Sequence, residues 1–503
     1  MTFLLNVVQH NSYADSVALM RLSDKISGSP GIKEAAIMIG TPANKEILAN
    51  ANLLGGDGQS AGPGDIILAV RAVDQNTANR VIAGWESELN KKAEGLSATE
   101  IWRPKTIRGA FEQQSDASMA IISVPGPFAI AEARKALTRN LNVLIFSDNV
   151  AIDEERAIKE EAKSRDLIVM GPDCGTAIIQ GKMLGFANSV PNGKIGIVGA
   201  SGTGIQEVSC LLAHMGHGIS HAIGVGGRDL TEQVGGISTL TAIDLLEKDP
   251  QTDHVIIISK PPSEKVCSKI LSKIERSSKT FTVCFLGSPL LQLSSNARQA
   301  KTLESAALQA ANQEIKPINS VSKNTGAAKR ILGLYAGGTL AAEAQIILID
   351  YGFSVTSNAP VPGALPIGSG NLQHTIIDLG ADEYTQGRPH PMIEPSIRSA
   401  PFLEACDDPT VGAILCDIVI GNGAHANPAG LLISLLSDLD HPPIFVSVTG
   451  TNQDPQGRDS QMKLLESAGC TVASSNAEAA RMAASSFGCS GNGGTSMTRR
   501  VSR

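Results

Sequence analysis

Two segments of this chain share one pattern, and that pattern strongly limits the folds available to it. Residues 193–207 have the sequence GKIGIVGASGTGIQE, and residues 330–344 have the sequence RILGLYAGGTLAAEA. In each, an apolar run rich in branched residues ends in a turn of glycine and other small residues, and a helix-forming run follows. The pattern predicts a strand, a tight turn and a helix N-terminus, twice.

The likeness continues downstream of both copies. AIGVGGRDL and LLEKDPQTDHVIIIS follow the first copy, and TIIDLGADEY and FLEACDDPTVGAILCD follow the second. Each half therefore predicts a strand, glycine turn, helix, strand, glycine loop, second helix and buried strand. Duplicated α/β units of this kind bind ligands at the carboxyl ends of their strands. We predict that two helix N-termini converge on one anion.

The residues of the two turns suit a phosphate or carboxylate. The first backbone N–H groups of a helix lack intrahelical partners, and the helix dipole adds partial positive charge there. Glycine lets an anion approach the backbone, and hydroxyl groups add donors. The alternative is a Rossmann-type turn without a ligand. The predicted phosphate-binding residues are Ser201, Gly202, Thr203, Gly204, Gly337, Gly338 and Thr339.

Composition excludes several classes of partner. A net charge of −7 and a pI near 5.8 argue against nucleic acid and anionic membranes. No apolar run reaches the roughly 18 residues that span a bilayer. The start, MTFLLNVV, lacks a basic segment and a cleavage site, and so predicts a first strand. The eight cysteines show neither CxxC nor zinc-like spacing, so we predict no metal and a cytoplasmic protein.

The order of the patterns predicts an α/β protein of several domains. We expect a small α+β, ferredoxin-like domain over residues 1–100 and a Rossmann-like domain over 101–191. Two flavodoxin-like domains are predicted over 192–320 and 328–487, followed by a disordered tail over 488–503. Residues 293–329 lose the alternation of strand and helix, which indicates a linker between the two duplicated units.

Polar loops at strand ends are further candidates. Ser147, Asp148 and Asn149 follow a predicted strand and suggest a nucleotide- or CoA-type loop; capping of the loop is the alternative. Cys174 follows another strand, but no adjacent histidine indicates an activated thiol, so we interpret it as structural. Lys45, near a predicted helix start, fits a solvated surface lysine better than an anion ligand.

These motifs resemble known families. VPGPF, LIVMGPDCGTAI, GKIGIVGASGTGIQEVS, GVGGRDL and LEKDPQTDHVIIISKPP resemble the α-subunit of succinyl-CoA synthetase. LYAGGTLAAEA, IIDLGADEYTQGRPHPMIEP and LCDIVIGNGAHANPAG resemble the carboxy-terminal domain of its β-subunit. Fused behind this amino-terminal domain, and together with SYADSVALM, GTPANK and FSDNV, they resemble the FdrA family over nearly the whole chain.

The chain departs from the synthetase at three points. Residues 284–299 contain no histidine where the synthetase carries its phosphohistidine, no GFTGSQG-type CoA loop precedes Met119, and no ATP-grasp domain is recognisable. The chain alone should therefore not run an acyl-CoA ligase cycle. The resemblance implies a CoA-binding type for the Rossmann-like domain over 101–191. It leaves the synthetase's phosphate site, and no cofactor beyond a remnant CoA or nucleotide site.

The FdrA resemblance implies one subunit of a multi-protein oxamate carbamoyltransferase in anaerobic allantoin breakdown. That enzyme interconverts oxalurate and phosphate with oxamate and carbamoyl phosphate, and we expect an oligomer with other subunits. Arg228 is the candidate anion clamp, with an internal Arg228–Asp229 salt bridge as the alternative. Arg388 and His390 are candidates for anion charge and proton transfer, although a histidine bonded to its own loop is equally expected. Lys260 is a weaker candidate.

Two rival functions remain open at this point. One is an acyl-CoA synthetase subunit, similar to the ADP-forming succinyl-CoA synthetase, that takes its missing parts from partner chains. The other is a non-catalytic scaffold whose anion site only binds.

Overall fold

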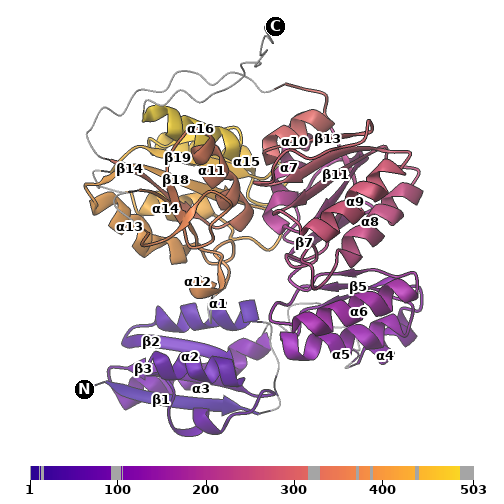
Figure 1. The fold of residues 1–503 in the computed structure, drawn as a ribbon. Helices are drawn as coiled ribbons and strands as arrows, with labels where there is room; N and C mark the ends of the chain where they lie inside the picture. The colour runs from indigo at the N-terminus through magenta and orange to yellow at the C-terminus, as the bar shows by residue number, and fades with distance from the viewer. Residues whose placement is uncertain are drawn as a thin grey trace, which may run out of the picture. The chain divides into compact units, whose positions relative to one another are not determined.

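A computed structural model describes residues 2–10, 12, 16–91, 104, 106–314, 329–369, 373–385, 389–436 and 441–487. The chain divides into two compact units. The first consists of residues 1–103 with residues 382–394, and the second contains the remainder (Figure 1). Arg388 and the tail from residue 488 lie outside the described residues. None of the described helices combines the length and apolar character needed to cross a membrane.

The first unit is built on a three-stranded antiparallel sheet of order β1-β3-β2. The strands and helices of the expected small α+β domain lie within residues 3–91, and residues 382–394 from the later part of the chain join the same unit. Leu68 and Val70 of the central strand pack with Leu19 and Trp85 of the helices in the core. Its elements are β1 (Phe3–Gln9), α1 (Ser16–Ser27), β2 (Ile32–Ile39), α2 (Pro42–Asn50), β3 (Ile66–Ala72), α3 (Gln75–Lys91) and α12 (Asp382–Thr385).

The second unit begins with a three-stranded parallel sheet of order β4-β5-β6. Its strands are short apolar runs, and alanine-rich helix faces pack on them in one core. The elements are α4 (Ile107–Gln113), β4 (Met119–Ile122), α5 (Gly126–Leu137), β5 (Asn142–Ile145), α6 (Ile152–Ser164) and β6 (Val169–Met170).

The first duplicated half follows as a seven-stranded sheet of order β13-β12-β11-β9-β10-β7-β8. Its central strands are parallel and buried, as a sheet with helices on both faces requires. Its elements are β7 (Thr176–Ile179), β8 (Lys182–Gly185), β9 (Asn192–Gly199), α7 (Gly202–His214), β10 (Ile219–Gly224), α8 (Ile237–Lys248), β11 (His254–Ser259), α9 (Glu264–Glu275), β12 (Thr280–Phe285), β13 (Ala297–Gln299) and α10 (Leu303–Ala310).

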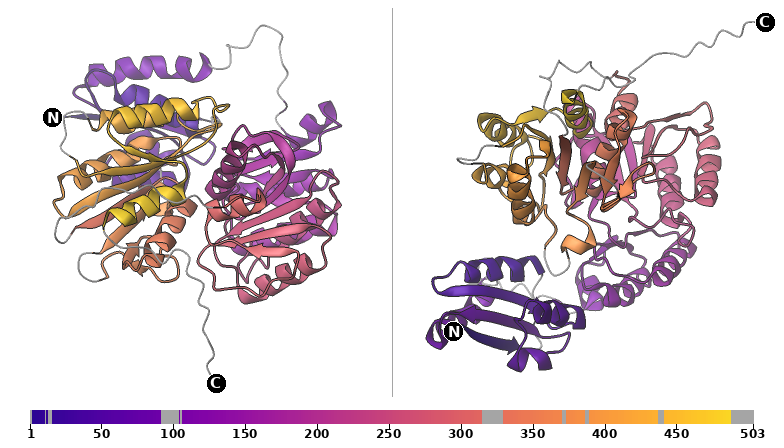
Figure 2. Two further views of the ribbon diagram at one scale, coloured as in Figure 1. Left: turned by 90° about the horizontal axis from the view of Figure 1, so that it is seen from above. Right: turned by 60° about the vertical axis from the view of Figure 1, so that its left-hand side comes forward.

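The second half repeats this plan in a sheet of order β16-β15-β17-β14-β18-β19-β20, which Figure 2 shows beside the first. Strand β14 takes the central place that β9 has in the first half. The elements are β14 (Arg330–Tyr335), α11 (Gly338–Asp350), β15 (Val355–Ser357), β16 (Leu365–Pro366), β17 (His374–Asp378), α13 (Ser399–Asp407), β18 (Val411–Val419), α14 (Pro428–Ser434), β19 (Ile444–Thr449), α15 (Arg458–Ser467), β20 (Thr471–Ala473) and α16 (Asn476–Ser486).

The prediction of a linker over residues 293–329 is wrong for its first part. Strand β13 pairs with β12, and helix α10 begins at a capping box in which the Thr302 and Ser305 side chains satisfy each other's backbone amides. Leu303, Ala306 and Ala307 are buried. The helix escaped prediction because small alanine residues, not large apolar ones, form most of its buried face.

Candidate functional site

The two glycine turns of the duplicated halves meet. The Ser201 hydroxyl forms a hydrogen bond with the Thr339 hydroxyl, across 138 residues of sequence. Helix α7 begins one residue after Ser201, and α11 begins at Gly338; the two helices are in contact (Figure 1). The structure therefore brings the predicted residues Ser201–Gly204 and Gly337–Thr339 to one place.

The start of α7 keeps its capacity for an anion. Ser201 caps the helix by accepting a hydrogen bond from the Gly204 amide at 3.0 Å. The amides of Gly202 and Thr203 have no intrahelical partner by their position, and no side chain among the described residues accepts from them. Ser201, Gly202 and Thr203 are half-buried. A side chain at Gly202 would meet the Thr176 hydroxyl at 3.1 Å, so this glycine also permits close packing.

The start of α11 already carries a carboxylate. The buried Asp417 side chain, in the carboxyl-terminal half of β18, accepts hydrogen bonds from the Ala336 amide at 2.8 Å and the Gly337 amide at 2.7 Å. Arg398 pairs with the same carboxylate at 2.6 Å and donates to the Asp417 carbonyl at 2.7 Å. Sequence reasoning missed Asp417; the available signal was a single aspartate inside an otherwise apolar strand.

A second carboxylate lies against the same turn. A Cβ atom placed on Gly338 would stand 2.5 Å from Oδ2 of Asp378, the last residue of β17. The two helix starts are thus chemically different: α7 offers hydroxyls and amides, whereas α11 is flanked by Asp378 and Asp417. The negative charges of Asp378 and Asp417 would repel an anion at the start of α11, so an incoming anion would be held closer to α7.

Arg228 is placed elsewhere in the second unit. Its guanidinium forms an ion pair with Glu155 at 2.8 Å and donates to the Val150 carbonyl at 2.8 Å. The side chain is 43% exposed. The described hydrogen bonds of Arg228 lead to the start of α6 and to its own loop, not to either glycine turn. Its role as an anion clamp stays a prediction.

The neighbour of Arg228 belongs to a buried ionic cluster. Lys159 donates to Glu155 and to Asp229, each at 2.8 Å, and to the Val225 carbonyl at 3.0 Å. Asp229 also accepts from the Thr239 amide at 2.9 Å and so caps the start of α8. In place of the expected alternative, an Arg228–Asp229 pair, Arg228 pairs with Glu155 and Asp229 pairs with Lys159. The cluster joins α6 to the glycine loop of the first duplicated half.

The other candidates have local partners. His390 belongs to the first unit, and its Nδ1 accepts a hydrogen bond from the Met392 amide at 3.2 Å. Lys260 is exposed at the end of β11. Lys45 donates to the Ala61 carbonyl at 2.9 Å and thereby holds a loop. These observations leave the chemical roles of His390 and Lys260 as predictions.

The loop of Ser147, Asp148 and Asn149 packs against the start of α5. The Ser147 hydroxyl donates to the Val124 carbonyl, and a Cβ on Gly126 would stand 2.2 Å from the Asp148 carbonyl oxygen. Asp148 and Asn149 remain exposed. Nearby, burial raises the pKa of the Cys174 thiol to about 12, so this thiol is not nucleophilic near neutral pH.

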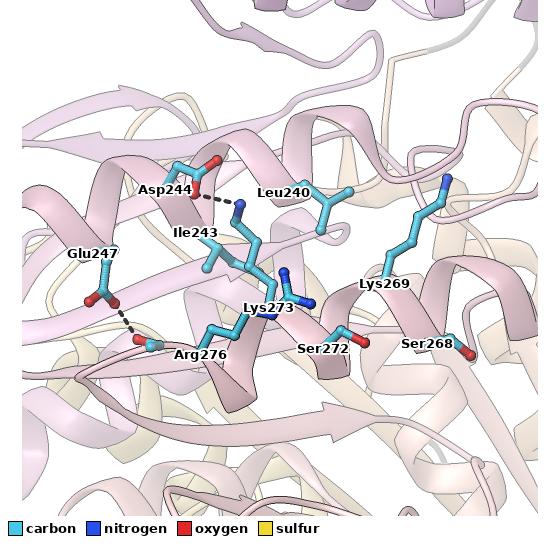
Figure 3. A pocket seen from close by; sticks show the side chains of 10 residues that line it. Leu240, Ile243, Asp244, Glu247, Ser268, Lys269, Ser272, Lys273 and Arg276 are labelled. Atoms are coloured by element: carbon cyan, nitrogen blue, oxygen red, sulfur yellow. Dashed lines mark hydrogen bonds and ion pairs between the residues drawn. The ribbon is translucent and has the colours of Figure 1, made fainter.

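An open groove lies between α8 and α9 (Figure 3). Its volume is about 620 Å³, and an ion pair between Lys273 and Asp244 at 2.5 Å crosses it. None of the predicted site residues lines this groove. We therefore do not assign the candidate site to it.

Three protein families match parts of the chain. A family described as CoA-ligase matches residues 334–486, and one described as CoA binding domain matches residues 191–287. The latter falls on the first duplicated half, one domain after the segment for which we predicted a CoA-binding type. A family described as the AllF heavy metal-associated domain matches residues 1–101.

The donor set of that first domain does not fit a heavy metal. Soft metal ions prefer thiolate and imidazole ligands. Residues 1–101 contain no cysteine and a single histidine, His10. The Nδ1 atom of His10 lies 3.2 Å from a carboxylate oxygen of Asp65, so its ring has a partner within the domain. We assign no metal to it.

One similar protein matches nearly the whole chain, and two others match less than a third of it. The chain is 36% identical over 496 residues to the uncharacterised protein YahF of Escherichia coli, covering 93% of this chain and 96% of YahF. It is 30% identical over 153 residues to the α subunit of the ADP-forming succinate–CoA ligase of Methanothermobacter thermautotrophicus. It is 29% identical over 163 residues to the malate–CoA ligase α subunit of Methylorubrum extorquens.

The coverage of these matches differs. The last two matches cover 29% and 31% of this chain, which spans about half the length of either subunit (50% and 53%). Among solved structures, the dinucleotide-forming acetyl-coenzyme A synthetase 1 of Ca. Korarchaeum cryptofilum matches with a TM-score of 0.32 and 15% identity, over 74% of this chain and 82% of that one. The full-length match to YahF, together with the three domain matches, shows that the chain belongs to the family of YahF, an FdrA/AllF-like family with the α/β architecture of succinyl-CoA synthetase.

Proposed function

We propose that this chain is the phosphate-handling core of a multi-chain acyl-CoA-ligase-type enzyme. An acyl phosphate is held where α7 and α11 begin, with its phosphoryl group on the amides of Gly202 and Thr203. The observation that carries the proposal is the hydrogen bond between Ser201 and Thr339, because it joins the two helix starts across the duplicated halves. The relatives that match 29% and 31% of the chain are named as ligase subunits, which supports a need for partner chains.

The chemistry follows from where charge develops. When a nucleophile attacks the acyl carbon, the C–O bond to phosphate breaks and the phosphate leaves with the electron pair. Fixed donors aimed at that leaving group lower the barrier, each by roughly 3–4 kcal/mol in a dry site. Ser201 and Thr339 would exchange their mutual hydrogen bond for bonds to the phosphoryl oxygens. Asp378 and Asp417 on the α11 side would keep the anion on the α7 side and favour its release.

Anion binding tests the proposal directly. We expect the full chain to bind inorganic phosphate and acetyl phosphate in isothermal titration calorimetry. Ser201→Ala should weaken phosphate binding about 10- to 100-fold, because a hydrogen bond to a charged group contributes about 1.5–3 kcal/mol. Thr106→Ala is a matched control: its hydroxyl also caps a helix, accepting from the Gly109 amide at 3.1 Å, but at α4. Equal affinity in wild type and Ser201→Ala would remove this site.

Carbamoyl transfer is a second candidate for the same site. Carbamoyl phosphate is itself an acyl phosphate, and the absence of histidine from residues 284–299 favours a reaction without a phosphohistidine. Incubation of the reconstituted complex with carbamoyl phosphate and oxamate should then yield oxalurate and phosphate. Formation of an acyl-CoA from an acid, CoA and a nucleoside triphosphate would instead support the ligase. If the complex binds phosphate but catalyses neither carbamoyl transfer nor acyl-CoA formation, the chain is an anion-binding scaffold.

A further inference from the structure

Two glutamates occupy equivalent positions in the duplicated halves. Glu207 is the sixth residue of α7, and Glu343 is the sixth residue of α11. Each reaches into the opposite half. Glu207 accepts a hydrogen bond from the amide of Asn476, the first residue of α16, at 3.0 Å. Glu343 accepts one from the amide of Leu303, the first residue of α10, at 2.6 Å.

Both carboxylates are buried where the four helices meet. Glu343 is 0% exposed and Glu207 is 3% exposed. The second oxygen of Glu207 accepts from the Thr449 hydroxyl, and that of Glu343 accepts from the Asn476 side-chain amide at 2.7 Å. Helices α7, α10, α11 and α16 contact one another in the second unit. The exchange is therefore reciprocal: each half caps a helix of the other.

The electrostatic surroundings of the two carboxylates are unequal. Arg458 faces Glu207, whereas no ion pair to Glu343 is found among the described residues. Glu304, on α10, is held by Arg481 of α16 at 2.7 Å. The groups that face Glu343 from the elements around it are Glu207 of α7, Glu304 of α10, Asn476 of α16, Cys284 of β12 and Tyr335 of β14, and Arg481 of α16 is paired with Glu304.

We propose that Glu207 and Glu343 form a reciprocal clamp, and act as positioning residues that fix how the starts of α7 and α11 face each other. Each carboxyl group lies at a helix N-terminus of the opposite half. There the first amides, which lack intrahelical partners, donate to its oxygen, and the helix dipole favours negative charge. The clamp rests on these contacts and does not require the anion site. Its consequence for ligand binding rests on the proposed anion site.

The clamp is sensitive to pH through Glu343. Burial, and then the nearby Glu207, raise the pKa of Glu343 from 4.5 to about 8 in the folded chain. Between about pH 4.5 and pH 8, Glu343 is therefore protonated in the folded state and ionised in the unfolded state. Stability contributed by this group is complete below about pH 4.5 and is lost as pH rises toward 8, by at most about tenfold in the unfolding constant per pH unit.

Hydrogen exchange of the full chain between pH 6 and 9 tests the clamp, after correction for intrinsic exchange rates. Glu343→Gln should keep the Leu303 amide protected and flatten the pH dependence of protection around α10. Glu343→Ala should raise exchange at Leu303 at least tenfold at every pH. Glu232→Gln, an exposed glutamate of the same half, is the control. Identical pH profiles in wild type and Glu343→Gln, or a protected Leu303 amide in Glu343→Ala, would overturn the clamp.

Phosphate titrations on the same samples separate the clamp from the proposed function. With both correct, Glu343→Ala loses protection at Leu303 and also binds phosphate more weakly. If wild type binds no phosphate while the exchange results hold, the anion site fails and the clamp stands. If Glu343→Ala does not fold, the comparison of wild type with Glu343→Gln across pH still decides.

Discussion

Replacement of Lys159 should strongly destabilise the first duplicated half and the domain before it. The ammonium group neutralises two carboxylates, Glu155 and Asp229, whose side chains are 1% and 0% exposed. Lys159→Met fills the same space, but both carboxylates stay buried and lose the positive charge that they share. Breaking a buried pair in this way typically costs about 3–5 kcal/mol. For a domain of this size that corresponds to a fall in melting temperature of roughly 10 °C.

Thermal unfolding monitored by circular dichroism measures the effect. Lys163→Met is the matched control, since Lys163 is on the same helix but exposed. Adding Glu155→Gln to Lys159→Met should recover part of the loss, because one unpaired charge disappears; the two changes should therefore not add. Equal melting temperatures for Lys159→Met and Lys163→Met would refute the reasoning that this cluster holds α6 to the glycine loop.

Two further results are expected. Asp417→Asn should lower stability by about 3 kcal/mol, because Arg398 is left buried without its partner, yet raise phosphate affinity in calorimetry by removing negative charge from the start of α11; a fall in both quantities would contradict the proposed asymmetry of the site. Cys174, with a thiol pKa of about 12, should react with iodoacetamide at pH 8 far more slowly than the half-buried Cys267, as peptide mass spectrometry of the folded protein would measure; comparable labelling would show that Cys174 is accessible and ionised.

The sequence predicted the parts of this molecule that local chemistry determines. The starts of α7 and α11 follow glycine turns that any L-residue with a side chain would strain or crowd, so the turns were visible without tertiary information. The strands of the first unit were visible because they are short runs rich in apolar residues. The meeting of Ser201 with Thr339 could be anticipated because the carboxyl ends of duplicated strands gather ligand-binding turns.

The remaining features depend on partners far away in sequence. Asp417 binds the Ala336 amide across 81 residues, and Lys159 binds Asp229 across 70. Nothing in the local pattern of a buried strand or an amphipathic helix marks such a charge as paired. Glu343 looked like an ordinary helix residue, although it is buried against the opposite half. The asymmetry of the two helix starts is therefore a product of tertiary contacts, and only the structure could disclose it.

A crystal structure of the full chain soaked with tungstate, an electron-dense phosphate analogue, tests the central claim most directly. The account predicts anomalous density for one oxyanion within hydrogen-bond distance of the Gly202 and Thr203 amides, with the Ser201 and Thr339 hydroxyls turned toward it. Density only at other sites, or helix starts that remain closed by their mutual hydrogen bond at saturating tungstate, would contradict it.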